Sequence, residues 1–279
     1  MRTIFVSIMC FLCVLSVSSA DVLDKVRESG TFTVGYRTDA PPFSYESNSG
    51  QPKGLAVSLC QDVSTALKAE LGLDEIKIDY VPVTARTRFE RLQSGAIDIL
   101  CGPTTQTISR RQDMDFSIPY FIDGSSVVFR AGEGESVEDL KGRAVGLLEG
   151  TTTAKIVRDL LADRKVDAEV ITYDTHINGL MALADGNIAA YFGDQAILRY
   201  QLGRMRPRTP LKFLAEQYSF EPYALAVKRE ETRLRLVVDS ALSQTFTNGD
   251  IYEHIAMALG EVTLSDLALA VYQIVALPD

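Results

Sequence analysis

The chain contains few of the residues that build metal sites. It has two histidines, His176 and His254, and four cysteines, of which only Cys60 and Cys101 lie beyond residue 20. The histidines are neither close together nor at the spacing of metal ligands, so a zinc site is disfavoured. We predict no cofactor.

Long apolar runs are scarce beyond the first 20 residues. The run over residues 4–17 follows Arg2 and ends in the small residues Ser18 and Ala20. This pattern is typical of a secretory signal cleaved after Ala20, and the run is shorter than the ~20 residues that a membrane anchor needs. We therefore expect export to the periplasm. Because no membrane-spanning segment is predicted further on, a membrane sensor or channel is disfavoured.

Export leaves two states open for the remaining cysteines. Cys60 and Cys101 could form one disulfide, as is common in exported proteins, or remain two buried thiols. The sequence does not show whether their Cα atoms approach within the required ~4.4–6.8 Å.

Positive charge is in deficit. The chain has 28 lysines and arginines against 37 acidic residues, a formal net charge of −9. Such an acid excess disfavours nucleic acids and anionic membrane surfaces as partners. Without residues 1–20 the length exceeds one typical domain and indicates two.

Predicted strands and helices alternate along the chain. The predicted strands cover residues 31–37, 76–83, 97–100, 125–129, 143–148, 168–173, 188–192 and 223–227. The predicted helices cover residues 22–30, 55–72, 86–95, 150–165, 177–184, 196–205, 231–249, 251–259 and 264–277. The paired prolines in residues 39–45 predict a rigid, non-helical loop. This alternation favours an α/β fold with largely parallel sheets flanked by helices.

A short internal repeat indicates two related lobes. The pattern L-x-x-G-x-I-x-x-x-x-G occurs at residues 92–102 and again at 183–193, each time as a helix end, a turn and a strand. The last helices add no new strand series, so we expect them to pack on the first lobe. This assigns residues 21–123 and 221–279 to lobe 1 and residues 124–220 to lobe 2. The chain would cross twice, near 122–126 and 218–223, and form a two-strand hinge.

Two polar stretches follow predicted strands. In the first, Gly102 is followed by Thr104, Thr105 and Thr107 and then by Arg110 and Arg111; in the second, Gly150 precedes three threonines at a helix start. Hydroxyls, a guanidinium and a helix N-terminus suit a small carboxylate. The alternative for the first stretch is an exposed threonine-rich turn.

Several motifs together resemble a known family. VGYRTDAPPFSY, RFERLQSGAIDILCGPTT, SRRQDMDFSIPYF, LKGRAVGLLEGTTTA and FGDQA occur in this order. They resemble the family 3 periplasmic solute-binding proteins of ABC transporters and are most similar to the glutamate/aspartate-binding branch. The resemblance implies a type II periplasmic binding protein fold, whose two lobes close on an amino acid and deliver it to a membrane permease. A monomer is expected.

The resemblance also implies ligand-binding residues. Arg110 and Thr105 would hold the ligand's α-carboxylate from lobe 1, and Thr151 or Thr152 would hold it from lobe 2. Asp194 would bind the α-ammonium group, although it could also cap the helix that follows it.

The side chain of the ligand would have its own set of residues. Arg37, Arg88 and His176 match positions that hold a side-chain carboxylate, so the implied ligand is acidic. Phe43 or Phe121 would form an apolar wall, with core packing as the alternative. Arg37, Arg88 and Arg110 around Asp194 alone would leave surplus positive charge for an anionic ligand to balance.

Two positions depart from the glutamate-binding pattern. Ala85 stands where that branch has a side-chain-binding serine, and Pro103 replaces another serine, so the identity of the ligand is open. Periplasmic dehydratases acting on prephenate or arogenate resemble the same family and are the alternative function. A dehydratase needs a free general acid or base. His176 and Asp194 are the candidates, and both have binding roles, so we expect no enzymatic activity.

Overall fold

The computed structural model describes residues 21–214, 216–260, 264 and 266–278. The secretory signal predicted for residues 1–20 lies outside the described residues. Within the described part of the chain, no helix combines the length and apolar character needed to cross a membrane.

Helices and strands alternate as the sequence predicts, with several short strands in addition. In chain order the elements are α1 (Val22–Ser29), β1 (Thr31–Arg37), β2 (Asp39–Ala40), β3 (Ser44–Glu46), β4 (Pro52–Lys53), α2 (Leu55–Leu71), β5 (Lys77–Val83), α3 (Arg88–Gln93), β6 (Ile99–Cys101), η1 (Arg110–Gln112), β7 (Met114–Asp123), β8 (Ser125–Arg130), η2 (Val137–Leu140), β9 (Ala144–Leu148), α4 (Thr152–Asp163), β10 (Glu169–Tyr173), α5 (His176–Ala184), β11 (Ala190–Asp194), α6 (Gln195–Arg204), β12 (Leu211–Phe213), β13 (Glu221–Lys228), α7 (Thr232–Asn248), α8 (Asp250–Leu259) and α9 (Asp266–Val275).

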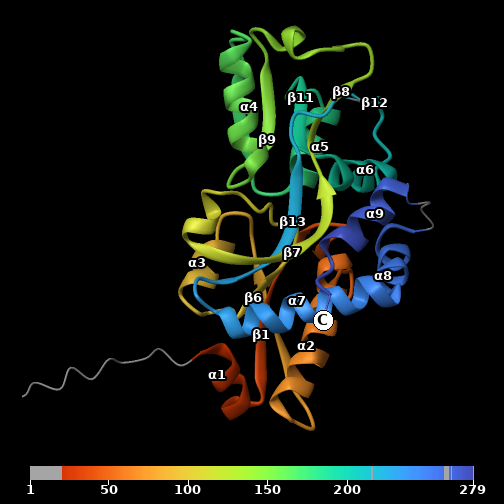
Figure 1. Ribbon diagram of the computed structural model, residues 1–279. Helices are drawn as coiled ribbons and strands as arrows, with labels where there is room; N and C mark the ends of the chain where they lie inside the picture. The colour runs from red at the N-terminus through yellow and green to blue at the C-terminus, as the bar shows by residue number, and fades with distance from the viewer. Residues whose placement is uncertain (1–20, 215, 261–263, 265, 279) are drawn as a thin grey trace, which may run out of the picture.

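Two five-stranded sheets organise these elements into two lobes, one above the other in Figure 1. The sheet of lobe 1 has the order β5-β1-β6-β13-β7, and that of lobe 2 has the order β10-β9-β11-β8-β12. The strands β6 and β11, which form the ends of the two copies of the internal repeat, both occupy the middle of their sheets. The α/β class predicted from the sequence is therefore confirmed.

Each sheet is only partly parallel. The first three strands of each order run parallel, whereas β13 and β7 in lobe 1 and β8 and β12 in lobe 2 are paired antiparallel to their neighbours. Three of these strands, β7, β8 and β13, adjoin the segments that pass between the lobes, and the sequence does not show from which end such a strand enters a sheet.

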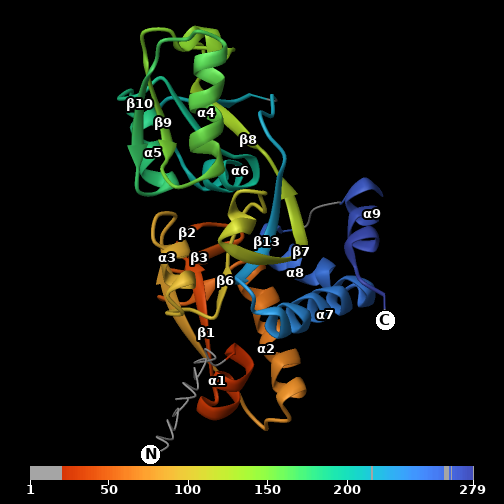
Figure 2. The same cartoon turned by 60° about the vertical axis from the view of Figure 1, so that its left-hand side comes forward.

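Side-chain alternation gives each sheet two buried faces. In β6, Ile99 and Cys101 pack with helices α1, α2, α7 and α8 on one face, while Leu100 packs toward α3 on the other. In lobe 2, helix α4 covers one face and helices α5 and α6 the other (Figure 2). Because both faces are covered, these strands are apolar at nearly every position.

The connections between the lobes run side by side. Strand β7 pairs with β13 as far as Glu221 opposite Asp123; in Figure 1, β7 leads from lobe 1 toward lobe 2 and β13 leads back. Gly124 sits at this crossing, where a Cβ atom would lie 2.2 Å from the carbonyl oxygen of Ser219. A larger residue would therefore push the two connections apart.

Two regions of lobe 1 differ from the sequence prediction. Residues 39–45, predicted as a loop, contribute β2 and β3 to a small three-stranded sheet with a cis peptide bond between Pro41 and Pro42 at the turn. Strand β7 was not predicted, and it contains Pro119. Proline cannot donate to a strand ladder, and β7 lies at the sheet edge, where this is tolerated.

The cysteines that the sequence left open are bonded to each other. Cys60 of α2 and Cys101 of β6 form a disulfide whose Cα atoms are 6.3 Å apart. This bond ties helix α2 to the central strand of lobe 1.

Candidate ligand-binding site

Residues from both lobes line a small cavity where the strand ends of the two sheets meet. Its lining is Arg37, Arg88, Pro103, Thr105, Arg110, Thr151, Thr152, His176, Asp194 and Ile197. Eight of the nine predicted ligand-binding residues are in this set. The remaining one, Phe43, is fully buried in lobe 1 against the rings of Phe121 and Tyr223.

Lobe 1 contributes three arginines to the cavity. Arg37 ends β1, and its Nε donates to Oδ1 of Asp39 at 2.8 Å; its Nη2 lies 2.7 Å from the same oxygen without hydrogen-bond alignment. Arg88 begins α3 and donates to the carbonyl oxygens of Ala85 at 2.5 Å and Gly150 at 2.8 Å. Its Nε has no hydrogen-bond partner among the described residues. Arg110 donates from Nη1 to the carbonyl oxygen of Thr105.

Burial and like charge shape the electrostatics of these arginines. Burial lowers the pKa of Arg88 well below its usual value, and the neighbouring charges of Arg37 and Arg110 lower it further. Burial also lowers the pKa of Arg110. Guanidinium groups nevertheless stay protonated in proteins, so Arg88 and Arg110 carry positive charge in the cavity.

Lobe 2 contributes hydroxyls and an imidazole. Thr151 caps α4, because its Oγ1 accepts from the backbone N–H of Ala154, and the same hydroxyl donates to the carbonyl oxygen of Leu148. Thr152 Oγ1 lies 3.3 Å from Thr105 Oγ1 of lobe 1. His176, the first residue of α5, is buried, and its Nδ1 lies 3.2 Å from the hydroxyl of Tyr191. Burial lowers the pKa of His176, which favours the neutral ring.

Asp194 is buried at the end of β11. It occupies the N-cap position of α6 but makes no capping hydrogen bond; instead it accepts from the hydroxyls of Thr153 at 2.6 Å and Tyr223 at 2.6 Å. Asp123, at the end of β7, accepts from the N–H of Ala196 in α6 and thus takes over the capping role. Burial and the nearby charge of Asp194 raise the pKa of Asp123 to about 7.

Glu221 is a further carboxylate that the sequence prediction missed. Its Oε2 accepts from Thr105 at 2.5 Å and Thr152 at 2.7 Å, and its Oε1 accepts from Ser219 at 2.8 Å. Burial raises the pKa of Glu221, and the charge of Asp194 raises it further. The available signal was weak: an acidic residue two positions before the predicted strand 223–227, beside the predicted crossing.

The predicted charge balance of the site is wrong. Arg37 is already paired with Asp39, and Arg110 lies in the fields of Glu221 and Asp194. The three arginines therefore face three carboxylates, where the sequence prediction counted one. The exception is Arg88, whose hydrogen bonds within the described residues go to carbonyl oxygens and to no carboxylate.

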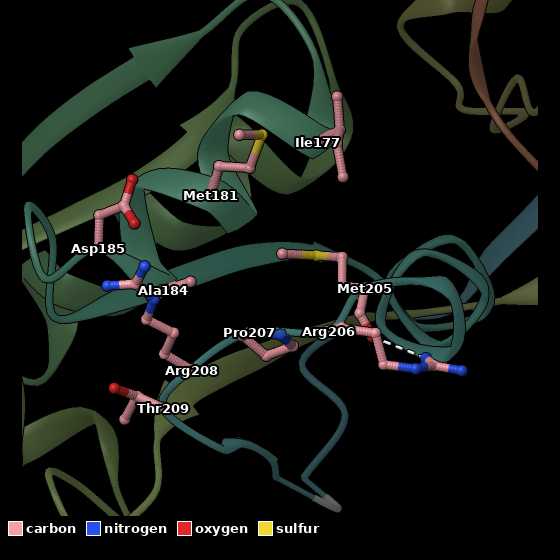
Figure 3. Close-up of a pocket in the computed structure, with 9 residues that line it drawn as sticks. All are labelled: Ile177, Met181, Ala184, Asp185, Met205, Arg206, Pro207, Arg208 and Thr209. Atoms are coloured by element: carbon pink, nitrogen blue, oxygen red, sulfur yellow. Dashed lines mark hydrogen bonds between the residues drawn. The ribbon is translucent and has the colours of Figure 1, made fainter.

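A larger pocket, of about 680 Å³, lies in lobe 2 and contains none of the predicted site residues (Figure 3). Its side chains come from α5, among them Met181, from Asp185 directly after α5, and from residues 205–209 after α6. It is formed within one lobe, whereas the smaller cavity joins charged and hydroxyl groups from both.

This fold is that of a two-lobe binding protein, and the chain belongs to family 3 of the bacterial extracellular solute-binding proteins. The family model matches residues 32–259. An L-glutamate/L-aspartate-binding protein from Pseudomonas aeruginosa is 32% identical over 231 residues, which cover 82% of this chain and 76% of that protein. A glutamate/aspartate import solute-binding protein from Salmonella typhimurium is 25% identical over 234 residues, covering 84% of this chain and 78% of that protein.

Solved structures share the fold over most of the chain. An ancestral arginine-binding protein bound to glutamine has a TM-score of 0.74 and 28% identity, covering 83% of this chain and 99% of that one. A mutant of ArgBP from T. maritima also has a TM-score of 0.74, with 25% identity, covering 86% of this chain and 99% of that one.

Proposed function

We propose that this protein is a periplasmic receptor that binds an acidic amino acid between its lobes and delivers it to the permease of an ABC transporter. The choice of an acidic ligand rests on the burial of Arg88 without a carboxylate partner among the described residues. Arg88 is 2% exposed, and within the described part of the chain its charge is paired with no carboxylate. An unpaired buried cation is costly, so the site favours a ligand that brings a second carboxylate. The glutamate/aspartate-binding relatives agree with this choice.

The α-amino acid group would be held from both lobes. Arg110 and Thr105 of lobe 1 and Thr152 of lobe 2 bind the α-carboxylate, and Asp194 binds the ammonium group. We prefer Thr152 to Thr151 because the hydroxyl of Thr151 already caps α4 and bonds to Leu148, whereas that of Thr152 lies beside Thr105.

The side-chain carboxylate would lie between Arg37, Arg88 and His176. The buried Nε of Arg88 is free to donate, and the neutral ring of His176 offers a further donor. For the carbon chain we assign the apolar contact to Ile197, which lines the cavity, in place of Phe43, which packs inside lobe 1.

Binding would require the lobes to open and close. The cavity has a volume of about 10 Å³, the space of a single water molecule. The lobes touch around it through Arg88 and Gly150, through Thr105 and Thr152, and through the rings of Tyr45 and Tyr200. We propose that residues 21–123 with 221–279 move against residues 124–220 about the crossing at Gly124, and that the receptor acts as a monomer.

A thermal-shift panel of the protein lacking residues 1–20 tests this function. L-Glutamate or L-aspartate should raise the melting temperature, while L-glutamine, which has nearly the same shape but no side-chain charge, should have a much smaller effect. A ligand at a thousand times its Kd adds about 4 kcal/mol of stability, which is readily detected. Stabilisation by neutral or basic amino acids alone would contradict the acidic ligand. Turnover of prephenate would contradict the receptor function.

A further inference from the structure

The carboxylate of Glu221 occupies a place that the proposed function gives to the ligand. It is 1% exposed and accepts from the hydroxyls of Thr105 and Thr152, which come from different lobes. A threonine hydroxyl has a single hydrogen to donate. The two hydroxyls therefore cannot serve Glu221 and the α-carboxylate of a ligand at the same time.

We propose that Glu221 is a built-in competitor of the ligand, which must displace its carboxylate from Thr105 and Thr152 in order to bind. This inference rests on the proposed function. Glu221 would thereby lower the affinity of the protein for the amino acid. Its carboxylate holds the two lobes together through the hydroxyls of Thr105 and Thr152 and must be released before these hydroxyls can hold the ligand.

A partner for the displaced carboxylate already exists. Ser219 donates to the other oxygen, Oε1, at 2.8 Å, and Ser219 also contacts Ser125 through hydroxyl oxygens 2.6 Å apart. These two serines stand on the two segments that cross between the lobes. Glu221 can thus leave the threonines and keep Ser219, and its position is coupled to the crossing about which we propose the lobes move.

The charges around Glu221 predict that binding takes up a proton. The groups that act on it are Asp194 at the end of β11, Arg110 of η1 and Tyr223 of its own strand. Burial and Asp194 already raise the pKa of Glu221. A ligand carboxylate arriving beside it would raise this pKa further, because like charges disfavour ionisation. Above the pKa of the free protein, the affinity should therefore fall as the pH rises, by at most about tenfold per pH unit.

The test uses calorimetric titration of L-glutamate into the wild type, Glu221→Gln and Glu216→Gln between pH 6 and 8. Glutamine keeps the shape of Glu221 but holds the hydroxyls less strongly, since hydrogen bonds to charged groups are the stronger ones. We expect E221Q to bind about tenfold more tightly at pH 8 and to lose most of the pH dependence. Glu216 is exposed and pairs with Arg164, so E216Q makes the same charge change and should match the wild type.

Each outcome decides between the two proposals. If the wild type binds no amino acid, the proposed function fails. If it binds L-glutamate and E221Q binds equally or more weakly with an unchanged pH profile, Glu221 is not a competitor, although the receptor function stands. Should E221Q fail to fold, the wild type alone decides: titrations in buffers of different ionisation enthalpy should show uptake of up to about one proton, and no uptake would overturn the inference.

Discussion

Replacement of Arg110 by alanine is expected to weaken L-glutamate binding by about thirtyfold or more. In the proposed complex Arg110 provides the charge-assisted, two-pronged contact with the α-carboxylate. Removing one partner of a buried ion pair costs about 2–5 kcal/mol, because the other partner is left buried without compensation, and each 1.4 kcal/mol is a factor of ten. Calorimetric titration of the variant measures the effect.

Arg111 provides a matched control for this prediction. It is the next residue of η1 and carries the same charge, but its side chain is exposed and does not line the cavity. R111A should bind L-glutamate within about twofold of the wild type, since surface charges away from a site contribute little. Equal losses in R110A and R111A would indicate a general effect of charge and would contradict the direct contact.

Replacement of Asp123 by asparagine is expected to change the pH dependence of stability. Measured against the wild type, the variant should be more stable at pH 8 than at pH 4. The pKa of Asp123 in the folded protein is about 7, against an ordinary value of 3.8. Between these values the folded state binds the proton and the unfolded state does not, so the free energy of unfolding falls as the pH rises. At about 1.4 kcal/mol for each pKa unit, the contribution lost between pH 4 and 8 is up to about 4 kcal/mol.

The difference between wild type and D123N isolates this carboxyl from the others. Urea denaturation at several pH values should show the stability of D123N rising against that of the wild type from pH 4 to pH 8. Asp113 is exposed, and D113N should follow the wild-type profile. Parallel curves for wild type and D123N would show that Asp123 ionises at its ordinary pKa. Burial and the charge of Asp194 would then not raise the pKa of this carboxyl group.

Local sequence patterns predicted most elements of the fold, because the periodicity of buried side chains is a local property. Leucine or valine at every fourth position from Leu55 to Leu71 predicted the helix that the structure shows as α2, with Gly72 ending it in a left-handed conformation. Strand β1 has the predicted bounds as well. The direction of β13 and the pairing of β7 were not predictable in this way, since both depend on how a distant segment returns to the sheet.

The residues of the site were likewise predictable where local motifs mark them and not where they depend on distant contacts. The threonines and arginines that follow strand ends were recognisable from their motifs, and the fold brings them to one cavity. Glu221 was missed because its partner Thr105 is 116 positions away and nothing local connects them. The pairing of Arg37 with Asp39 could have been predicted from the sequence, because the two residues are two positions apart. Phe43 was placed near the ligand by resemblance, but its aromatic neighbours hold it inside lobe 1.

The most direct test of the central claim is a crystal structure of the protein, lacking residues 1–20, grown with L-glutamate. We predict that the ligand lies between the lobes, with its α-carboxylate on Arg110, Thr105 and Thr152, its ammonium group on Asp194 and its side-chain carboxylate on Arg37 and Arg88. Glu221 should be turned away from the threonines. L-Glutamate bound only elsewhere, as in the lobe 2 pocket of Figure 3, or bound between the lobes with its side chain away from Arg88, would contradict the account.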